Sequence, residues 1–132
     1  MKSITIFWFR RDLRIEDNCG LFHALKENKN VLPIFIYDLN ILKNFSDDDP
    51  RIEFIYNSLK LLDDTFKKNQ SSIKIFKGEP EKIFSQLLTD YNIKNVFFNR
   101  DYEPYAIERD QKIKKFLNSK KIDVFDFKDH VI

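Results

Sequence analysis

The sequence predicts an α/β fold with a five-stranded parallel sheet in the order 3-2-1-4-5, Rossmann-like, and helices on both faces. Five short apolar runs, rich in β-branched and aromatic residues, have the length of strands. Four amphipathic segments alternate with them, and strict alternation of strand and helix favours a parallel sheet covered on both faces. With 132 residues, of which 42% are hydrophobic, the chain has enough apolar surface for a core, so we expect one domain over residues 1–132.

The first strand is expected at residues 4–9, a continuous apolar run typical of a strand buried on both faces. A charged loop, residues 10–17, follows it. Asn18 or Asp17 then suits the N-cap of a helix that runs to about Glu27. The inner face of this helix is expected to carry Leu21, Phe22 and Leu25.

The second strand is expected at residues 31–37, with Pro33 near its start because proline donates no ladder hydrogen bond. After a polar connection over residues 38–49, Asp49 is expected to cap a second helix over residues 50–68, which opens on proline. This helix has the clearest apolar stripe in the chain, with residues recurring at spacings of three and four. The stripe consists of Ile52, Ile55, Leu59, Leu62 and Phe66.

The second half of the chain repeats the alternation. A third strand at residues 72–77 leads through a turn at residues 78–80 into a third helix. A fourth strand at residues 95–99, a helix at residues 104–119 and a fifth strand at residues 121–127 follow, and the last five residues are left without an element. The third helix is expected to face inward with Ile83, Phe84, Leu87, Leu88 and Tyr91, and the fourth with Ile113, Phe116 and Leu117.

Composition and motifs exclude several classes of function. The formal net charge of +2 gives no electrostatic footprint for nucleic acid. Two glycines cannot form a G-x-G-x-x-G motif or a P-loop. Two widely separated histidines and the lone Cys19 do not make a metal site or a disulfide. We expect Cys19 to be buried or half-buried, His23 to lie on a helix surface and Trp8 to pack in the core.

The same observations indicate the compartment. One cysteine is typical of a reducing environment. No apolar run is long enough to span a membrane, and the order of charge and hydrophobicity near the N-terminus fits no signal peptide. We therefore expect a cytoplasmic protein with no membrane partner.

Charged loops are expected to meet at the carboxyl edge of the sheet, where doubly wound folds bind ligands at the point of strand reversal. That point lies between the first and fourth strands. Single Arg and Asp residues at strand ends more often form structural ion pairs, and Asp12 and Asp110 suit that role, with Arg10 or Arg11 as partner. The loops around this edge bring together Arg10, Arg11, Asp12, Arg14, Asp38, Arg51, Arg100, Asp101 and Glu103.

Two motifs in this region carry a family resemblance. The stretch of residues 8–14, WFRRDLR, followed by Asp17 and Asn18, closely resembles the start of DNA photolyases and cryptochromes. The stretch of residues 99–105, NRDYEPY, followed by Arg109 and Asp110, resembles the second hallmark of that family. Further landmarks agree in order and spacing, namely the second strand, the turn at residues 78–80, and Arg51 with Ser58 and Leu59.

The resemblance covers the whole chain and implies the N-terminal α/β domain of a photolyase-like flavoprotein. In the family this domain binds an antenna chromophore that passes excitation energy to FAD. Reduced, excited FAD then donates an electron to a pyrimidine dimer flipped out of UV-damaged DNA and splits it. FAD and the DNA surface belong to a larger C-terminal helical domain, which we expect beyond residue 132. Without it, this chain is expected to be non-catalytic and to self-associate through the uncovered interface.

The resemblance also supplies candidate chromophore contacts, which are Arg10, Asp12, Phe35, Asp38, Arg51, Asp101 and Glu103. Where folate-using members often carry an Asn-Glu pair, this chain has Tyr105 and Ala106. This departure favours a deazaflavin or flavin antenna over folate. Two alternatives stay open: a cryptochrome-type blue-light photoreceptor, and a stand-alone nucleotide-binding α/β module supported by the fold alone.

Overall fold

The computed structural model describes residues 2–128. Its sheet has five parallel strands in the order β3-β2-β1-β4-β5, which confirms the predicted topology. The strands are β1 (Ser3–Phe9), β2 (Val31–Asp38), β3 (Lys74–Gly78), β4 (Asn92–Asn99) and β5 (Asp123–Phe127). The order places β1 between β2 and β4, so the reversal point lies between β1 and β4.

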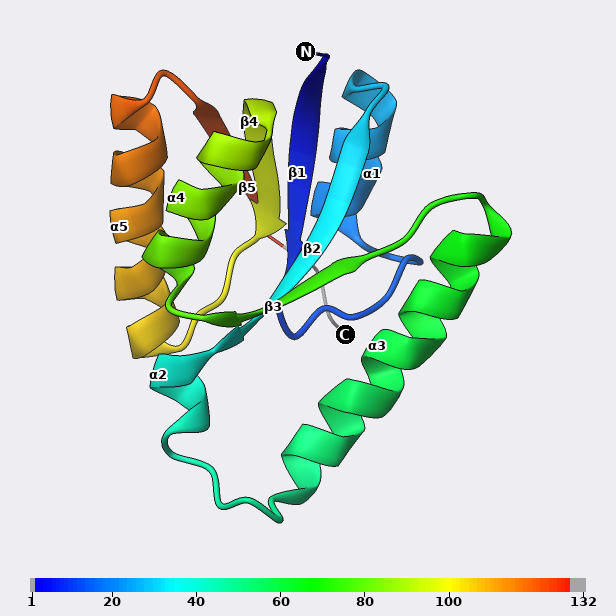
Figure 1. The fold of residues 1–132 in the computed structure, drawn as a ribbon, viewed down its shortest axis with the longest axis vertical. Coiled ribbons are helices and arrows are strands. Elements are labelled where there is room, and N and C mark those ends of the chain that lie inside the picture. Colours follow the sequence, from blue (N-terminus) through cyan, green and yellow to red (C-terminus); the bar gives the residue numbers. More distant parts are fainter. Residues whose placement is uncertain (1, 129–132) are drawn as a thin grey trace.

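Helices cover both faces of the sheet, as predicted (Figure 1). They are α1 (Cys19–Glu27), α2 (Leu39–Leu42), α3 (Pro50–Lys68), α4 (Pro80–Asp90) and α5 (Pro104–Ser119). In Figure 1, α4 and α5 lie in front of the sheet and α1 lies behind it, while α3 slants away from the strands. The N-terminal half of α3 extends past the carboxyl edge of the sheet, beside the connection from α2.

Two apolar clusters separate these layers. The cluster under α4 and α5 is built around Trp8 of β1, with Phe84 and Phe98 packed edge-to-face against its ring. The cluster under α1 and α3 contains Phe7, Phe9 and the predicted α3 stripe from Ile55 to Phe66, which is most deeply buried at Leu59 and Leu62. Alternate residues of β1 therefore feed opposite cores, as a strand with two covered faces requires.

Helix α1 differs from the prediction. Leu21 is buried as predicted, but Phe22 and Leu25 are 59% and 53% exposed, and Gly20 and Ala24 are buried in their place. The reason is the closeness of the helix to β4: a Cβ at position 20 would come within 2.8 Å of Asn99 Oδ1 and 2.9 Å of the Phe7 ring. At this close approach a side chain larger than that of glycine does not fit at position 20.

Several boundaries also shift by a few residues. Strand β4 begins at Asn92, three residues earlier than predicted, because a register irregularity at β1 lets this polar stretch pair with Ser3. Strand β5 begins later, at Asp123, because Lys121 has a positive φ of 63° and donates its N–H to Asn118. The single helical turn α2 lies within the connection predicted to be irregular. Pro33 precedes the first β2–β3 pair, as its missing donor requires.

Candidate functional site

The carboxyl edge of the sheet carries the candidate site, and Asn99 at the end of β4 organises it. Its Nδ2 donates to Asp12 Oδ2 at 2.6 Å and to Asn18 Oδ1 at 2.7 Å. Its Oδ1 accepts from the Gly20 N–H at 2.7 Å. Asn18 in turn caps α1 by accepting from the Leu21 N–H, which decides between the two predicted caps. One buried amide thus joins the β1 loop, the start of α1 and the end of β4.

Arg10 fills the space between the β1 end and α5. Its side chain is 6% exposed and forms a charge-assisted hydrogen bond with Asp110, while Nη1 donates to the Asn99 carbonyl at 2.7 Å. The guanidinium carbon lies 4.0 Å from the ring centroids of both Trp8 and Phe98. Burial lowers the pKa of Arg10 to about 10 against the opposing effect of Asp110, so the side chain is charged at neutral pH.

Asp12, a predicted structural member, accepts the backbone N–H of Arg10 at 2.7 Å and is 8% exposed. The other predicted structural member, Asp110, is the partner of Arg10 rather than of Arg11. The structure therefore joins the two candidate contacts Arg10 and Asp12 into a buried brace through the Arg10 N–H and the Asp12 carboxylate. This arrangement fixes the loop that follows β1.

Asp38, at the end of β2, is the acceptor of a second network. It receives hydrogen bonds from the Tyr105 hydroxyl at 2.9 Å and from the Asn40 backbone N–H at 2.9 Å. Arg109 Nη1 lies 3.3 Å away, and its Nε contacts Asp110 at 3.1 Å. Because Asp110 also pairs with Arg10, the ends of β1 and β2 are coupled through α5.

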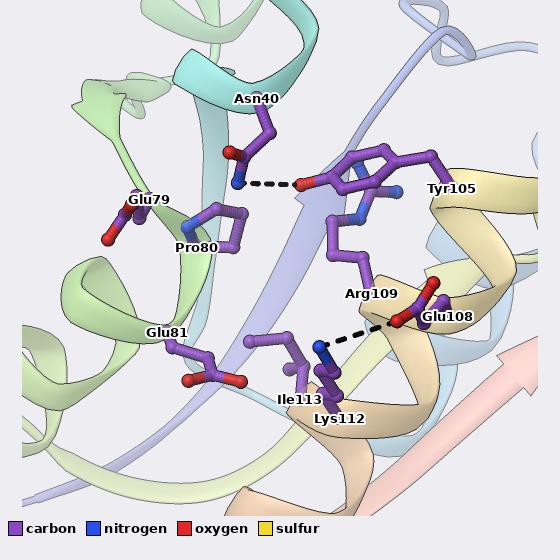
Figure 2. A pocket seen from close by; sticks show the side chains of 9 residues that line it. All are labelled: Asn40, Glu79, Pro80, Glu81, Tyr105, Glu108, Arg109, Lys112 and Ile113. Carbon is purple, nitrogen blue, oxygen red and sulfur yellow. Dashed lines mark hydrogen bonds and ion pairs between the residues drawn. The ribbon is translucent and has the colours of Figure 1, made fainter.

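A cleft of about 260 Å³ opens beside this second network (Figure 2). Figure 2 shows the Asn40 amide directed at the Tyr105 hydroxyl across its upper rim, with Pro80 and Ile113 supplying apolar walls. The remaining lining residues are Glu79, Glu81, Glu108, Arg109 and Lys112. The cleft therefore combines an aromatic edge with both donors and carboxylate acceptors, which suits a small polar ring system.

The Tyr105 phenol supplies a measurable pH signature. Burial and the hydrogen bond to Asp38 raise its pKa from 10.0 to about 12. Because the folded-state pKa is the higher one, the stabilisation by this contact is complete below pH 10 and is lost as the pH rises through about 12. In a spectrophotometric alkaline titration we expect Tyr105→Phe to remove the last phenol to ionise, while Tyr102→Phe at an exposed position leaves it. A late phenol that persists in Tyr105→Phe would contradict this assignment.

A third cluster lies on the exposed side of the edge. Arg11 Nη2 lies 3.1 Å from Asp101 Oδ1 and 3.2 Å from Glu103 Oε1. Burial tends to raise the pKa of Asp101, but hydrogen bonds from the Glu103 N–H and from Arg11 outweigh it and leave that pKa below its ordinary value. Asp101 and Glu103 thus place two carboxylate groups close together on this edge, both in contact with Arg11.

The two remaining candidates lie apart from these networks. Arg51, at the start of α3, forms a two-point contact with the Asp49 carboxylate and stacks over Phe45 at 3.9 Å. No contact among the described residues joins it to the other candidates. Phe35 is 6% exposed and belongs to the core under α1 and α3, where its ring packs on Tyr37.

The sequence analysis did not single out Asn99, Arg109 or Asn40 as site residues. A signal for Arg109 existed, because residues 106, 109, 113 and 117 recur at helical spacing and Arg109 falls inside this buried stripe of α5. Asn99 opens the motif at residues 99–105, but the motif did not indicate which of its residues is buried. Asn40, within a polar connection, gave no signal.

Cys19 and His23 have simple environments on α1. Cys19 is half-buried, as expected, whereas His23 is half-buried with its ring stacked 4.5 Å from that of Phe127, rather than being a plain surface residue.

Within residues 2–128, no group of acidic, His or Cys side chains has the arrangement of a metal site. No helix in that part of the chain is long and apolar enough to cross a membrane. Of the last five residues, for which no element was predicted, residues 129–132 lie outside the described part of the chain.

Comparisons with known proteins agree with this geometry. The chain is 32% identical to a (6-4)DNA photolyase of Arabidopsis thaliana over 98% of its length, and it spans 25% of that relative. It superposes with a TM-score of 0.82 and 37% identity on an archaeal photolyase from Sulfolobus tokodaii, covering 96% of this chain and 29% of the other. That structure is described as holding two FAD molecules, with the implication of a novel light-harvesting cofactor.

A cryptochrome from Synechocystis sp. PCC6803 shares the fold, with a TM-score of 0.86 at 24% identity. The chain thus spans about a quarter of the length of the photolyase relatives it matches. The family model described as DNA photolyase matches residues 5–132, nearly the whole sequence. The resemblance predicted from the two motifs is confirmed, and the chain belongs to the DNA photolyase family.

Proposed function

We propose that this chain is the N-terminal, antenna-chromophore-binding domain of a deoxyribodipyrimidine photolyase, with a flavin or deazaflavin as the antenna. The observation that carries the proposal is the 37% identity, over 96% of the chain, to an archaeal photolyase described with two FAD molecules. One of two flavins in a photolyase serves as the repair cofactor, so a second one is available as an antenna.

The acceptors on the exposed side of the edge support a flavin-type ligand. Asp101 and Glu103 present carboxylate oxygens next to each other, held by Arg11, and such acceptors suit ring N–H donors. Arg51 is exposed on α3, beyond the same edge, where a guanidinium suits a ring carbonyl or a phosphate-bearing tail. Arg10 and Asp12 serve this site indirectly, since their hydrogen bonds hold the loop that carries Arg11.

The complete protein is proposed to carry FAD in a C-terminal helical domain and to repair pyrimidine dimers in UV-damaged DNA under blue light. Exposed apolar side chains on α1 and α3, including Phe22, Leu25, Phe54 and Leu61, support a covering partner for this domain. In the 132-residue chain alone these side chains are proposed to mediate self-association, which sedimentation velocity would detect as a dimer.

The antenna assignment is tested by titrating the 132-residue chain into FAD, FMN, a deazaflavin and a reduced folate, followed by fluorescence anisotropy. We expect the flavins or the deazaflavin to bind more tightly than folate. Paired substitution Asp101→Asn with Glu103→Gln is expected to raise the Kd about tenfold, the equivalent of one lost charged contact. The matched control Glu27→Gln, at the opposite edge of the sheet, is expected to leave the Kd unchanged.

Other outcomes separate the alternatives. Preferential folate binding would contradict the flavin assignment, and tight ATP binding without any chromophore would favour a stand-alone nucleotide-binding module. The fold shared with a cryptochrome keeps a photoreceptor role as the second candidate. A dimer-repair assay on the full-length protein under blue light distinguishes the two, since a photoreceptor would leave the lesions intact.

A further inference from the structure

Trp8 is the single tryptophan of the chain, and it lies in an unusual charge environment. Its ring is 2% exposed, and two guanidinium groups lie over it. The guanidinium carbons of Arg10 and Arg109 are 4.0 Å and 4.9 Å from the ring centroid. Two arginine side chains therefore lie over one buried aromatic ring, an environment distinct from ordinary core packing.

Two carboxylates formally balance the two positive charges, so the effect on the ring depends on where each charge lies. The carboxylates of Asp110 and Asp38 hydrogen-bond to N–H groups at the edges of the two guanidiniums, whereas the ring lies over a guanidinium carbon. Two buried donors, Arg10 Nε and Arg109 Nη2, have no hydrogen-bond partner in the described part of the chain. The indole therefore has two cations nearby, and their counter-ions are bound along the guanidinium edges.

This environment changes the electron-donor property of the indole. Removing one electron from Trp8 would create a radical cation beside two existing cations. The attraction between each cation and the ring would be lost, and charge repulsion at 4–5 Å would replace it. Tryptophan is among the most easily oxidised side chains, and here both arginines oppose its oxidation.

Oxidation of Trp8 matters because of its place on β1. Trp8 is the penultimate residue of the strand, and at a rise of about 3.3 Å per residue it lies roughly 7 Å along the strand from the start of the charged loop. If a flavin binds at the carboxyl edge, as proposed above, an indole close to it could donate one electron to the photoexcited ring system. Return of that electron would dissipate the excitation as heat with no net change in bonding. Trp8, near the end of β1, is the indole whose electron donation would have to be suppressed.

We propose that Arg10 and Arg109 are positioning residues that act through Trp8: they prevent it from donating an electron to a photoexcited flavin at the carboxyl edge. The excitation is thereby kept available for transfer to a second cofactor. The role of the flavin rests on the proposed function, whereas the suppressed oxidation of Trp8 does not. The two arginines would thus allow an oxidisable side chain to be kept near a light-absorbing ligand.

Charge-neutral and charge-preserving variants of Arg109 test the proposal. Arg109→Gln removes the cation but retains a donor for Asp38, while Arg109→Lys retains the cation. With FAD bound, as verified separately by anisotropy, we expect Arg109→Gln to shorten the flavin fluorescence lifetime at least about threefold, consistent with the loss of one cation–π contact. Trp8→Phe added to Arg109→Gln is expected to restore the lifetime, whereas Arg109→Lys and Trp8→Phe alone are expected to keep it long.

An unchanged lifetime in Arg109→Gln, or a short one that Trp8→Phe does not restore, would overturn the proposal. A chain that binds no flavin at all would instead overturn the proposed function. In that case a second measurement decides, in which azide radicals generated by pulse radiolysis oxidise the protein without any chromophore. We expect a higher yield of the tryptophan radical in Arg109→Gln than in the wild-type chain or in Arg109→Lys, and equal yields would refute the inference.

Discussion

Arg10→Met is expected to destabilise the domain by about 3–5 kcal/mol, the range for removing one partner of a buried ion pair. Arg10 pairs with Asp110 and donates to the Asn99 carbonyl at 2.7 Å, and both contacts are buried or partly buried. Methionine would fill much of the space between Trp8 and Phe98 but would leave the Asn99 carbonyl without this donor. The expected loss is therefore electrostatic rather than a loss of packing.

The neighbouring arginine provides a matched control. Arg11 is 68% exposed at its side chain, and its contacts with Asp101 and Glu103 are screened by solvent. Arg11→Met is expected to change the unfolding free energy by less than about 1 kcal/mol. Urea denaturation of both variants measures the contrast. Equal effects at the two positions would show that the burial of the Arg10 pair does not govern stability here.

Asn99→Asp is expected to lower the free energy of unfolding by about 3 kcal/mol at neutral pH, although the substitution only replaces one NH₂ group by an oxygen. Asn99 Nδ2 donates to Asp12 Oδ2 at 2.6 Å and to Asn18 Oδ1 at 2.7 Å. In the variant, a carboxylate oxygen would face two acceptors, one of them charged, inside the protein. Two buried groups would lose their donor and a like-charge contact would replace it.

The cost should depend on pH in a defined direction. Burial and the facing Asp12 would raise the pKa of the new carboxyl in the folded state, so folding would favour its protonated form. A protonated carboxyl donates as the amide did, and the variant should regain stability as the pH falls from about 7 to about 5. Urea denaturation at both pH values measures this change.

Asn57→Asp, at an exposed position of α3, is the control and is expected to cost less than about 0.5 kcal/mol. A loss at position 99 that does not recover at low pH would contradict the charge explanation. It would point instead to the geometry of the Gly20 contact with the Asn99 amide.

The sequence by itself determined the fold class, the order of the strands and the edge that carries the charged loops. The elements follow from local patterns: apolar runs for strands, a three-four stripe for α3, and proline or asparagine at helix starts. The strand order and the edge were expected from the doubly wound architecture that these elements indicate. It also determined the family, because two motifs lie in the loops that follow β1 and β4.

Only the tertiary structure decided which charged residues are buried in ion pairs and which face solvent. Arg10 and Arg11 are adjacent and chemically identical, yet one is buried between two aromatic rings and the other faces solvent. Alternation along the end of β1 sends successive side chains to opposite sides, and the partner of each comes from about 90 or 100 residues away. No local pattern encodes such distant pairs.

The same reason explains the errors in α1 and the overlooked residues. Phe22 and Leu25 fit an amphipathic pattern, but the approach of α1 to Asn99 of β4 selects the small face instead. Arg109 lies in the buried stripe of α5 because Asp38 and Asp110 are there to receive its guanidinium. The residue types determine where helices and strands form. Long-range hydrogen bonds and close packing determine which face of an element is buried and which partner each side chain contacts.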